Sequence, residues 1–367
     1  MRNKKIAIFV AKAEGGGAEK SATNVANFIA SKGYELDFIT LKQNTNKKLL
    51  HKNINHINLN VSRLLFSIPK LFKYLIRNNH KKFYFVSFLN GPNVIGIFLK
   101  LIFHKFNLVC TLHNPLTSHL KYTTFRDKVI ILILLIFKNI PQKYITCSYY
   151  IKKELIEKYN FKKNNLRNVY GPIDFVEMSK KRRIKNNFFK KNKKNNKVLI
   201  SIGRLSYQKN YSDLILKLKN LLLKKNIILI ILGVGNEYSK LKSLIKKNKL
   251  SKKVFLLGYK SDPVEYMRNS DLFILNSRWE GLGLVLIESI FLKIPIICNK
   301  CPGGVNEIFD NTNNKTIFDF NNQKRLEDTI KELLYKKNKK NFMLKKKYLN
   351  KFKLHQAANE YLKFIIS

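Results

Sequence analysis

The strongest constraint on the fold is an alternation of short apolar segments with helical segments, which the chain shows twice. The apolar segments are rich in Ile, Val, Leu and Phe, as buried strands are, and Ala18, Ala22, Val25 and Ile29 follow at helical spacing. Such alternation predicts an α/β fold with parallel sheets covered by helices on both faces. The expected strands are 6–10, 36–41, 54–59, 83–88, 106–112 and 143–148, then 197–203, 227–233, 254–259, 271–276 and 294–299.

The two series are separated by a basic stretch. Residues 180–197 hold ten Lys or Arg and no acid, which predicts an exposed linker at 176–197. A length of 367 residues suits two domains. We therefore expect two doubly wound, Rossmann-like domains at 1–175 and 198–345, with a helix in 346–367 that packs back toward the first. A ligand would bind in the cleft that they face, beyond the carboxyl ends of the strands.

The net charge of +48 is the largest departure from ordinary composition. It predicts a polyanionic partner, namely nucleic acid, an anionic membrane or a phosphorylated substrate. The excess is spread over the chain, since residues 1–175 hold 29 Lys+Arg and 8 Asp+Glu and the remainder holds 42 and 15. The chain is also rich in Asn and Ile, so biased codon usage is an equal explanation.

The N-terminus and the cysteines favour the cytoplasm. The apolar run at 6–10 is too short for a cleavable signal and is expected to be the first strand. Four cysteines, Cys110, Cys147, Cys298 and Cys301, suggest a reducing compartment. The last two form a CxxC, but no second ligand pair accompanies it and a Pro-Gly-Gly loop follows. A plain loop is therefore favoured over a metal or redox site.

One apolar run bears on whether the protein contacts a membrane. Residues 129–137, VIILILLIF, lie between Lys128 and Lys138 and are far short of the roughly 20 residues of a membrane span. A buried core helix is the favoured interpretation. An interfacial helix with basic flanks is the alternative.

Residues 280–288, EGLGLVLIE, place two of the scarce carboxylates around a glycine pair. Glu280 is expected in a loop, and Glu288 in the second turn of a helix that starts near Gly283. Gly281 and Gly283 lack a Cβ and let a ligand approach the backbone, while the helix N-terminus attracts an anion. Two hydroxyl-accepting carboxylates with a phosphate seat between them suit a nucleotide sugar.

A second motif, GRLSYQKN at 203–210, agrees with this. Gly203 ends a predicted strand, and Arg204 and Lys209 follow in the loop. Two cations at a strand's carboxyl end can hold a diphosphate and stabilise it as it leaves, a role that a divalent metal plays elsewhere.

In this order the motifs resemble family 4 glycosyltransferases of the GT-B fold, and the resemblance covers nearly the whole chain. The segments that carry it are EGGGAEK (14–20), TLHNP (111–115), CS (147–148), VYGPID (169–174), GRLSYQKN, DLFILNSRWEGLGLVLIE and CPGGVNEI. Gly171 departs from the family's usual Asn, and FYFVSF lacks an acid often found at its start. The first of these departures puts a local hydrogen bond in doubt.

The resemblance implies roles for residues of the nucleotide-sugar-binding second domain. Glu280, next to Gly281, would accept hydrogen bonds from donor-sugar hydroxyls, and Glu288 would hold the ribose hydroxyls. Arg204 and Lys209 would clamp the diphosphate.

Further roles concern backbone groups and the acceptor-side first domain. Backbone N–H groups around Gly283 and Leu284 would meet phosphate or sugar. His113 would face the donor sugar at the reacting centre, and Gly16 and Gly17 would form a loop that approaches donor and acceptor. The catalytic set would then be His113, Arg204, Lys209 and Glu280.

The implied reaction is retaining transfer of a hexose-type sugar from a nucleotide sugar, with UDP favoured, and needs neither metal nor cofactor. The acceptor would be a glycan or lipid-linked glycan of cell-surface polysaccharide or glycoconjugate assembly, with a soluble acceptor as the alternative. The enzyme would be cytoplasmic, peripheral on the inner face of the membrane. A basic nucleic-acid-binding protein without transferase activity would explain the charge but not the order of motifs, so no nucleic acid partner is expected.

Overall fold

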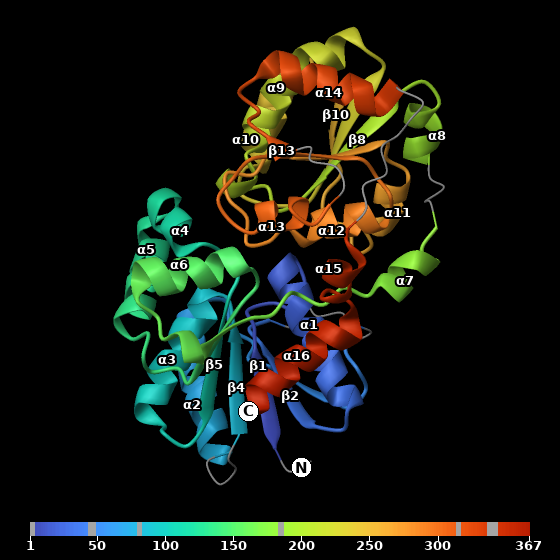
Figure 1. The fold of residues 1–367 in the computed structure, drawn as a ribbon. Helices are drawn as coiled ribbons and strands as arrows, with labels where there is room; N and C mark the ends of the chain where they lie inside the picture. Colours follow the sequence, from blue (N-terminus) through green and yellow to red (C-terminus); the bar gives the residue numbers. More distant parts are fainter. Residues whose placement is uncertain (1–3, 43–48, 79–82, 183–186, 313–316, 336–343) are drawn as a thin grey trace. The chain divides into compact units, whose positions relative to one another are not determined.

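The computed structural model shows two compact units (Figure 1). The first unit comprises residues 1–173 and 350–367, and the second unit comprises residues 174–349. The structure describes residues 4–42, 49–78, 83–182, 187–312, 317–335 and 344–367. Among these residues, no helix has both the length and the apolar character that crossing a membrane requires.

The first unit is built on a seven-stranded parallel sheet in the order β3-β2-β1-β4-β5-β6-β7. Its central strands are buried on both faces, which explains why they consist of almost nothing but apolar residues. The strands are β1 Lys5–Phe9, β2 Glu35–Thr40, β3 Ile54–Asn58, β4 Phe83–Phe88, β5 Asn107–Leu112, β6 Lys143–Thr146 and β7 Leu166–Asn168.

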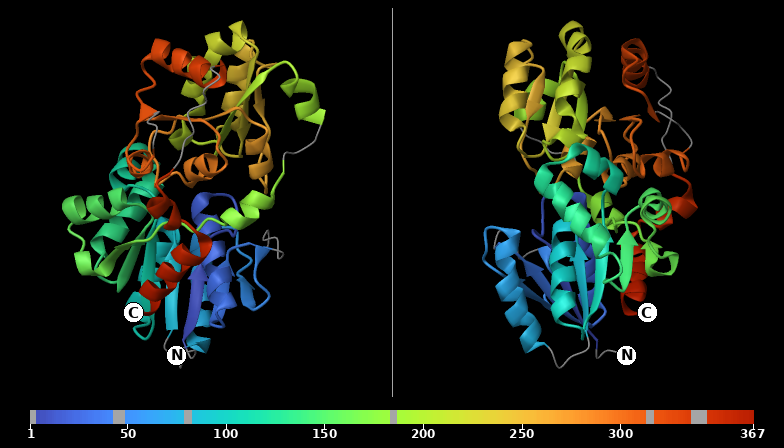
Figure 2. Two further views of the ribbon diagram at one scale, coloured as in Figure 1. Left: turned by 45° about the vertical axis from the view of Figure 1, so that its right-hand side comes forward. Right: turned by 90° about the vertical axis from the view of Figure 1, so that its left-hand side faces the viewer.

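Helices cover both faces of this sheet (Figure 2). Alternate strand residues such as Ile8 and Val86 pack with α1 and α16, whose Tyr361 is fully buried. On the other face Tyr74 of α2 meets Phe83, and α3 packs on β4 and β5. The helices are α1 Gly17–Ser31, η2 Leu64–Ser67, α2 Ile68–Arg77, α3 Asn90–Ile102, α4 Leu116–Tyr122, α5 Phe125–Ile136, α6 Tyr149–Tyr159, η3 Lys163–Asn165 and α16 Leu354–Ile366.

The second unit has a six-stranded parallel sheet in the order β10-β9-β8-β11-β12-β13. Its strands are β8 Lys197–Ile202, β9 Ile227–Leu232, β10 Val254–Leu256, β11 Leu272–Leu275, β12 Ile296–Asn299 and β13 Ile317–Phe318. Its helices are α7 Phe175–Lys180, α8 Asn187–Lys193, η4 Tyr207–Lys209, α9 Tyr211–Lys224, α10 Tyr238–Lys247, α11 Val264–Arg268, α12 Leu284–Phe291, α13 Val305–Phe309, α14 Gln323–Tyr335 and α15 Lys346–Asn350. All the strands expected from the sequence are present, and β7 and β13 are additional.

The structure corrects the predicted linker at 176–197. Its described residues form most of α7 and all of α8, and they belong to the second unit. Phe188 lies 5.0 Å from Phe255 between ring centroids, and Phe189 is buried against Tyr266. The two aromatic residues thus anchor a segment that its lysines alone would leave in solvent. Residues 183–186 of the predicted linker lie outside the described part.

The apolar run at 129–137 falls mostly in α5, and the structure corrects its interpretation as a buried core helix. Ile131 and Leu134 are fully buried, whereas Leu132 is 50% exposed and Ile136 is 71% exposed. One side of α5 packs on the protein and the opposite side presents apolar groups to solvent.

Candidate active site

The predicted C-terminal motifs meet at one edge of the second sheet. The loop 203–210 follows β8 and the loop 276–283 follows β11, and these two strands are adjacent. The strand order reverses between them, because the chain winds from β8 to β9 and β10 on one side and from β11 onward on the other. The crevice beyond such a switch point is where ligands bind in doubly wound sheets.

The two loops are fastened to each other by Gln208. Its carbonyl accepts from the Arg278 N–H at 2.8 Å, and its side-chain amide donates to the Trp279 carbonyl at 2.9 Å. The Arg278 guanidinium also lies 4.2 Å from the centre of the Tyr207 ring. The groups that the loops carry are thus held in a fixed arrangement.

The central feature of the edge is a buried ion pair that the sequence did not predict. Lys209 Nζ and Ser277 Oγ both donate to Oε1 of Glu280, each at 2.5 Å. The side chains of Lys209 and Glu280 are 14% and 7% exposed. Within the described residues, the other carboxylate oxygen of Glu280 accepts no hydrogen bond, so it has acceptor capacity for a further hydroxyl.

The loop Cys301–Gly304 supports Glu280 from behind. The Glu280 N–H donates to the Pro302 carbonyl, and the Gly304 N–H donates to the Gly281 carbonyl, both at 3.0 Å. A Cβ on Gly303 would lie 1.6 Å from the Glu280 carbonyl oxygen, and φ of Gly303 is +121°. Only glycine fits there. In the sequence this segment contributes only to the family resemblance, and its supporting role was not predicted.

A third loop holds the 203–210 loop. A Cβ on Gly233, which follows β9, would lie 2.0 Å from the Gly203 carbonyl oxygen. The Leu205 N–H donates to the Val234 carbonyl at 3.0 Å. Arg204, at the start of the held loop, is exposed, whereas Lys209 at its end is turned inward to Glu280. The two predicted cations therefore differ in exposure, since Arg204 faces solvent and Lys209 is largely buried beside Glu280.

Helix α12 begins at Leu284, directly after Gly283, as the sequence predicted. Glu288 lies in its second turn and is buried, while Glu280 lies in the preceding loop. The two carboxylates therefore sit on different parts of the motif. The first-turn N–H groups of α12, of which that of Leu286 donates to the Gly283 carbonyl at 2.9 Å, form the positive end of the helix.

His113 lies just after β5 in the first unit, at the carboxyl edge of that sheet. Its Nε2 is 3.0 Å from Thr111 Oγ1, and its ring stacks on Phe88 at 5.6 Å. Behind it, Asn93 accepts from Ser87 Oγ at 2.7 Å and donates to the Thr111 carbonyl at 2.9 Å. Burial lowers the pKa of His113 to about 4, so the imidazole is neutral at pH 7.

The glycine loop follows β1 and leads into α1, which begins at Gly17 with Gly16 as its N-cap residue. The Glu19 carboxylate folds back onto this turn, 2.6 Å from the place where a Cβ of Gly16 would lie. Because β1 and β4 are the neighbours at which the first sheet reverses its order, this loop also lies at a switch point.

The CxxC carries no sign of metal or redox chemistry. Burial raises the pKa of Cys298 and of Cys301, with a further contribution from the Glu280 charge, so both thiols are protonated at neutral pH. Across the described residues, no three His, Cys, Asp or Glu side chains gather in a group that could hold a metal ion.

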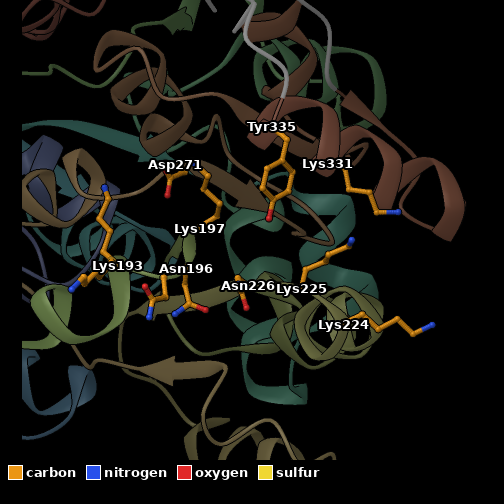
Figure 3. Close-up of a pocket in the computed structure, with 11 residues that line it drawn as sticks. Lys193, Asn196, Lys197, Lys224, Lys225, Asn226, Asp271, Lys331 and Tyr335 are labelled. Carbon is orange, nitrogen blue, oxygen red and sulfur yellow. The ribbon is translucent and has the colours of Figure 1, made fainter.

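A hollow of about 680 Å³ lies elsewhere on the second unit (Figure 3). Its lining includes Lys197, Asn226 and Asp271, which stand at or just before the starts of β8, β9 and β11. It therefore lies at the amino ends of the strands, opposite the predicted site, and none of the predicted site residues lines it. The side chains of Lys224 and Lys331 extend away from its centre. We do not regard it as the active site.

Comparison with known families agrees with the geometry at the two carboxyl edges. Residues 183–349 match the model of the glycosyl transferases group 1, and residues 15–177 match that of glycosyltransferase family 4. The chain belongs to glycosyltransferase family 4. This family 4 enzyme is thus a transferase, and the alternative of a nucleic-acid-binding protein without transferase activity is set aside.

Characterised relatives align with this glycosyltransferase over most of its length. It is 26% identical to a Campylobacter jejuni enzyme, the N-acetylgalactosamine-N,N'-diacetylbacillosaminyl-diphospho-undecaprenol 4-alpha-N-acetylgalactosaminyltransferase, over 98% of this chain and 96% of the relative. It is also 26% identical to the amylovoran biosynthesis glycosyltransferase AmsD of Erwinia amylovora, over 80% of each chain.

Solved structures confirm the predicted GT-B fold of the glycosyltransferase. Anabaena Alr3699/HepE in complex with UDP and glucose superposes with a TM-score of 0.79 over 99% of both chains, at 18% sequence identity. WaaG, a glycosyltransferase involved in lipopolysaccharide biosynthesis, superposes with a TM-score of 0.70 over 98% of this chain and 95% of its own.

Proposed function

We propose that this glycosyltransferase moves a sugar from a UDP-sugar to a glycan or lipid-linked acceptor with retention of configuration, in the assembly of a cell-surface polysaccharide or glycoconjugate. The observation that carries the donor part is the Lys209–Glu280–Ser277 cluster at the β8–β11 switch point. It offers a carboxylate oxygen for a sugar hydroxyl beside a buried cation and the positive end of α12.

Relatives support the choice of donor and acceptor. The Campylobacter jejuni relative is named for an acceptor on diphospho-undecaprenol, and the Erwinia relative for biosynthesis of the polysaccharide amylovoran. Structures of Anabaena HepE hold UDP and UDP-glucose. Both features are proposals for this chain, as is a location on the cytoplasmic side of the membrane.

In this proposal each part of the donor is bound by a different group of the protein. Glu280 accepts from sugar hydroxyls through its open oxygen, and Glu288 accepts from the ribose hydroxyls. Arg204, the α12 N-terminus and Lys209 balance the charge of the diphosphate. Since Lys209 is paired with Glu280, part of its charge is already balanced before the donor binds. The exposed Arg204 is proposed to contact the diphosphate directly.

In the proposed step the bond between the anomeric carbon and the diphosphate oxygen breaks. The acceptor oxygen forms the new bond on the same face, and the acceptor proton passes to the departing phosphate. Neutral His113 offers a hydrogen bond near the reacting carbon without adding a charge. The step uses no metal ion and no cofactor, which is part of the proposal.

The test has two parts. A thermal-shift screen of the full chain against UDP-, GDP- and ADP-sugars should show stabilisation by a UDP-sugar, since a ligand that binds only the folded state raises its stability. Transfer to a synthetic polyprenyl-diphosphate-linked acceptor should then give a product whose anomeric configuration, determined by NMR, matches the donor. Stabilisation by GDP- or ADP-sugars alone, or an inverted product, would refute the proposal. Glu280→Gln should lower transfer, because its carboxylate is proposed to accept from the sugar hydroxyls. Glu157→Gln, at an exposed position of α6, is the control.

A further inference from the structure

Helix α5 presents its exposed apolar side chains on one face. Phe125, Val129, Leu132 and Ile136 are spaced four, three and four residues apart, which places them on one stripe. Phe125 is 83% exposed, whereas the opposite side of the helix is buried through Leu134. A surface helix of a globular protein normally has the reverse arrangement, with its apolar stripe inward.

The helices beside α5 show the same feature. Helix α3 packs against both α5 and α2 (Figure 1), and Phe72 of α2 stacks edge-to-face with Phe103 at 4.7 Å. Of the 23 large apolar side chains exposed in the described part of the chain, 13 lie between residues 64 and 137. Besides those of α5, they are Leu65, Phe66, Phe72, Ile76, Phe98, Leu101, Ile102, Tyr122 and Phe137. Such a concentration on neighbouring elements marks an interaction surface.

The same region is strongly basic. Residues 61–140 contain twelve Lys or Arg and a single acid, Asp127. That acid lies in the first turn of α5 and accepts from Thr124 Oγ1 at 3.0 Å. Exposed cations lie among the apolar side chains, including Lys70 and Lys73 on α2 and Arg126 on α5. Apolar groups interleaved with cations, with almost no acids, suit a partner whose surface is both apolar and negatively charged.

We propose that the outer surface of η2, α2, α3 and α5, hereafter the docking face, binds an anionic lipid bilayer by inserting its apolar side chains among the lipids. A second copy of this chain is a poor occupant, because two faces of the same positive charge would repel. Nucleic acid is a less suitable one, because seven of the 13 exposed side chains are aliphatic and offer no stacking surface to bases, whereas all 13 can enter the apolar part of a bilayer. The docking face deepens the proposed function, since it would bring the enzyme to a lipid-linked acceptor.

The contribution of the face can be separated from the general basicity of the chain. The second unit offers a matched control in helix α9, where Leu216 and Leu223 are 47% and 46% exposed. Helix α10 offers Lys240 and Lys242 as charge controls on the same unit. All these positions are exposed, so their replacement should leave the fold intact.

The experiment is co-sedimentation of the full chain with vesicles of phosphatidylglycerol and phosphatidylcholine, and with vesicles of phosphatidylcholine alone. We expect binding to the anionic vesicles that weakens at high salt. The double variant Leu132→Ser with Ile136→Ser should weaken vesicle binding on the order of a hundredfold, because two aliphatic side chains that insert into the lipid are removed. Leu216→Ser with Leu223→Ser should bind as the unmodified chain does.

A charge test completes the design. Lys70→Glu with Lys73→Glu should weaken binding far more than Lys240→Glu with Lys242→Glu, and equal losses in both pairs would overturn a localised face. Loss of self-association rather than vesicle binding in the α5 variant would show an interface between copies and also overturn the proposal. Hydrolysis of the sugar nucleotide in solution should stay unchanged in the α5 variant, so that a failure of docking is distinguishable from a failure of the proposed catalysis.

Discussion

The two units rest on parallel sheets of the same winding, yet the predicted catalytic residues at the carboxyl edges of these sheets are of opposite kinds. In the second unit the edge holds a charged pair, Lys209 with Glu280, at 2.5 Å. In the first unit it holds His113, which is neutral and is positioned by the uncharged Thr111 and Asn93. The comparison shows that one backbone design supports two chemistries, because the loops beyond the strands decide which groups are presented.

The outer surfaces differ as well. The first unit gathers its exposed apolar side chains on one set of helices, whereas those of the second unit, such as Leu216 and Val234, are scattered over several elements. The first unit thus has the surface that favours a partner, and the second has at the carboxyl edge of its sheet the charged groups that we propose to bind the nucleotide sugar.

The largest effect is expected from breaking the ion pair of the second unit. Lys209→Met leaves the Glu280 carboxylate buried without its cation, which should cost about 3–5 kcal/mol of unfolding free energy. Glycosyl transfer should fall by roughly a hundredfold or more. Denaturant unfolding and initial rates provide the two measurements, with the exposed Lys240→Met as control.

The double variant Lys209→Met with Glu280→Leu sharpens this test. Replacing both charges by apolar groups should recover most of the lost stability, because no unpaired charge stays buried, while activity stays low. Recovery of activity together with stability would show that the pair is only structural.

The neutral histidine of the first unit gives the next effect, and it depends on pH. Since folding lowers the pKa of His113 from 6.5 to about 4, the folded state binds fewer protons than the unfolded state between these values. His113 therefore contributes stability above pH 6.5 that is lost as the pH falls toward 4. Over this pH range the unfolding free energy should fall by about 3 kcal/mol.

Unfolding free energies at pH 7 and pH 4 provide the measurement. His113→Asn should lack this part of the pH dependence, and replacement of the exposed His104 by Gln should retain it. Parallel curves for the His113 variant and the unmodified chain would contradict a neutral imidazole in the folded state.

A smaller effect separates the two carboxylates of the EGLGLVLIE motif. Glu288→Ala should weaken binding of the free nucleoside diphosphate by about 1.5–3 kcal/mol, the value of a hydrogen bond to a charged group. Glu280→Ala should change this affinity less and lower turnover instead, because its partner is on the sugar. Calorimetric titration of both variants with UDP measures the difference, and equal losses would remove the division of roles.

The smallest expected effect is none at all. EDTA should leave transfer unchanged, because the diphosphate charge is assigned to Arg204, to the α12 N-terminus and to the paired Lys209. Initial rates with EDTA, and with EDTA followed by excess Mg²⁺ or Mn²⁺, check this. Inhibition that is reversed by the metal would transfer the role from these groups to an ion.

Much of this architecture is predictable because fully buried parallel strands must be apolar along their whole length. The strands at 83–88 and 227–232 illustrate this, whereas β7 and β13 have three and two residues and leave no pattern. The start of α12 was predictable from Gly283. The apolar run in α5 did not reveal its exposed side, since a segment that is apolar all round does not indicate which face the protein covers.

The sequence predicted which residues belong to the candidate site, but it did not predict that two of them contact each other. Lys209 and Glu280 were each assigned to a ligand, yet they contact each other across 71 positions of sequence. That contact depends on the adjacency of β8 and β11 and on the loop locked by Gln208. The need for glycine at position 303 was missed for a similar reason, because the backbone that leaves no room for a Cβ there is that of Glu280, which is remote in sequence.

The return of the last helix to the first unit has a consequence for biosynthesis. Helix α16 is held there by Lys143 Nζ, which donates to the Phe364 carbonyl at 2.9 Å, and by the Tyr84 hydroxyl, which donates to the Ile366 carbonyl at 3.2 Å. The ribosome therefore delivers all of the second unit before it delivers the final layer of the first. During translation the sheet face that carries Ile8 and Val86 is covered by α1 but not yet by α16. A nascent chain that stops short of residue 354 would leave the part that α16 covers exposed to chaperones and proteases.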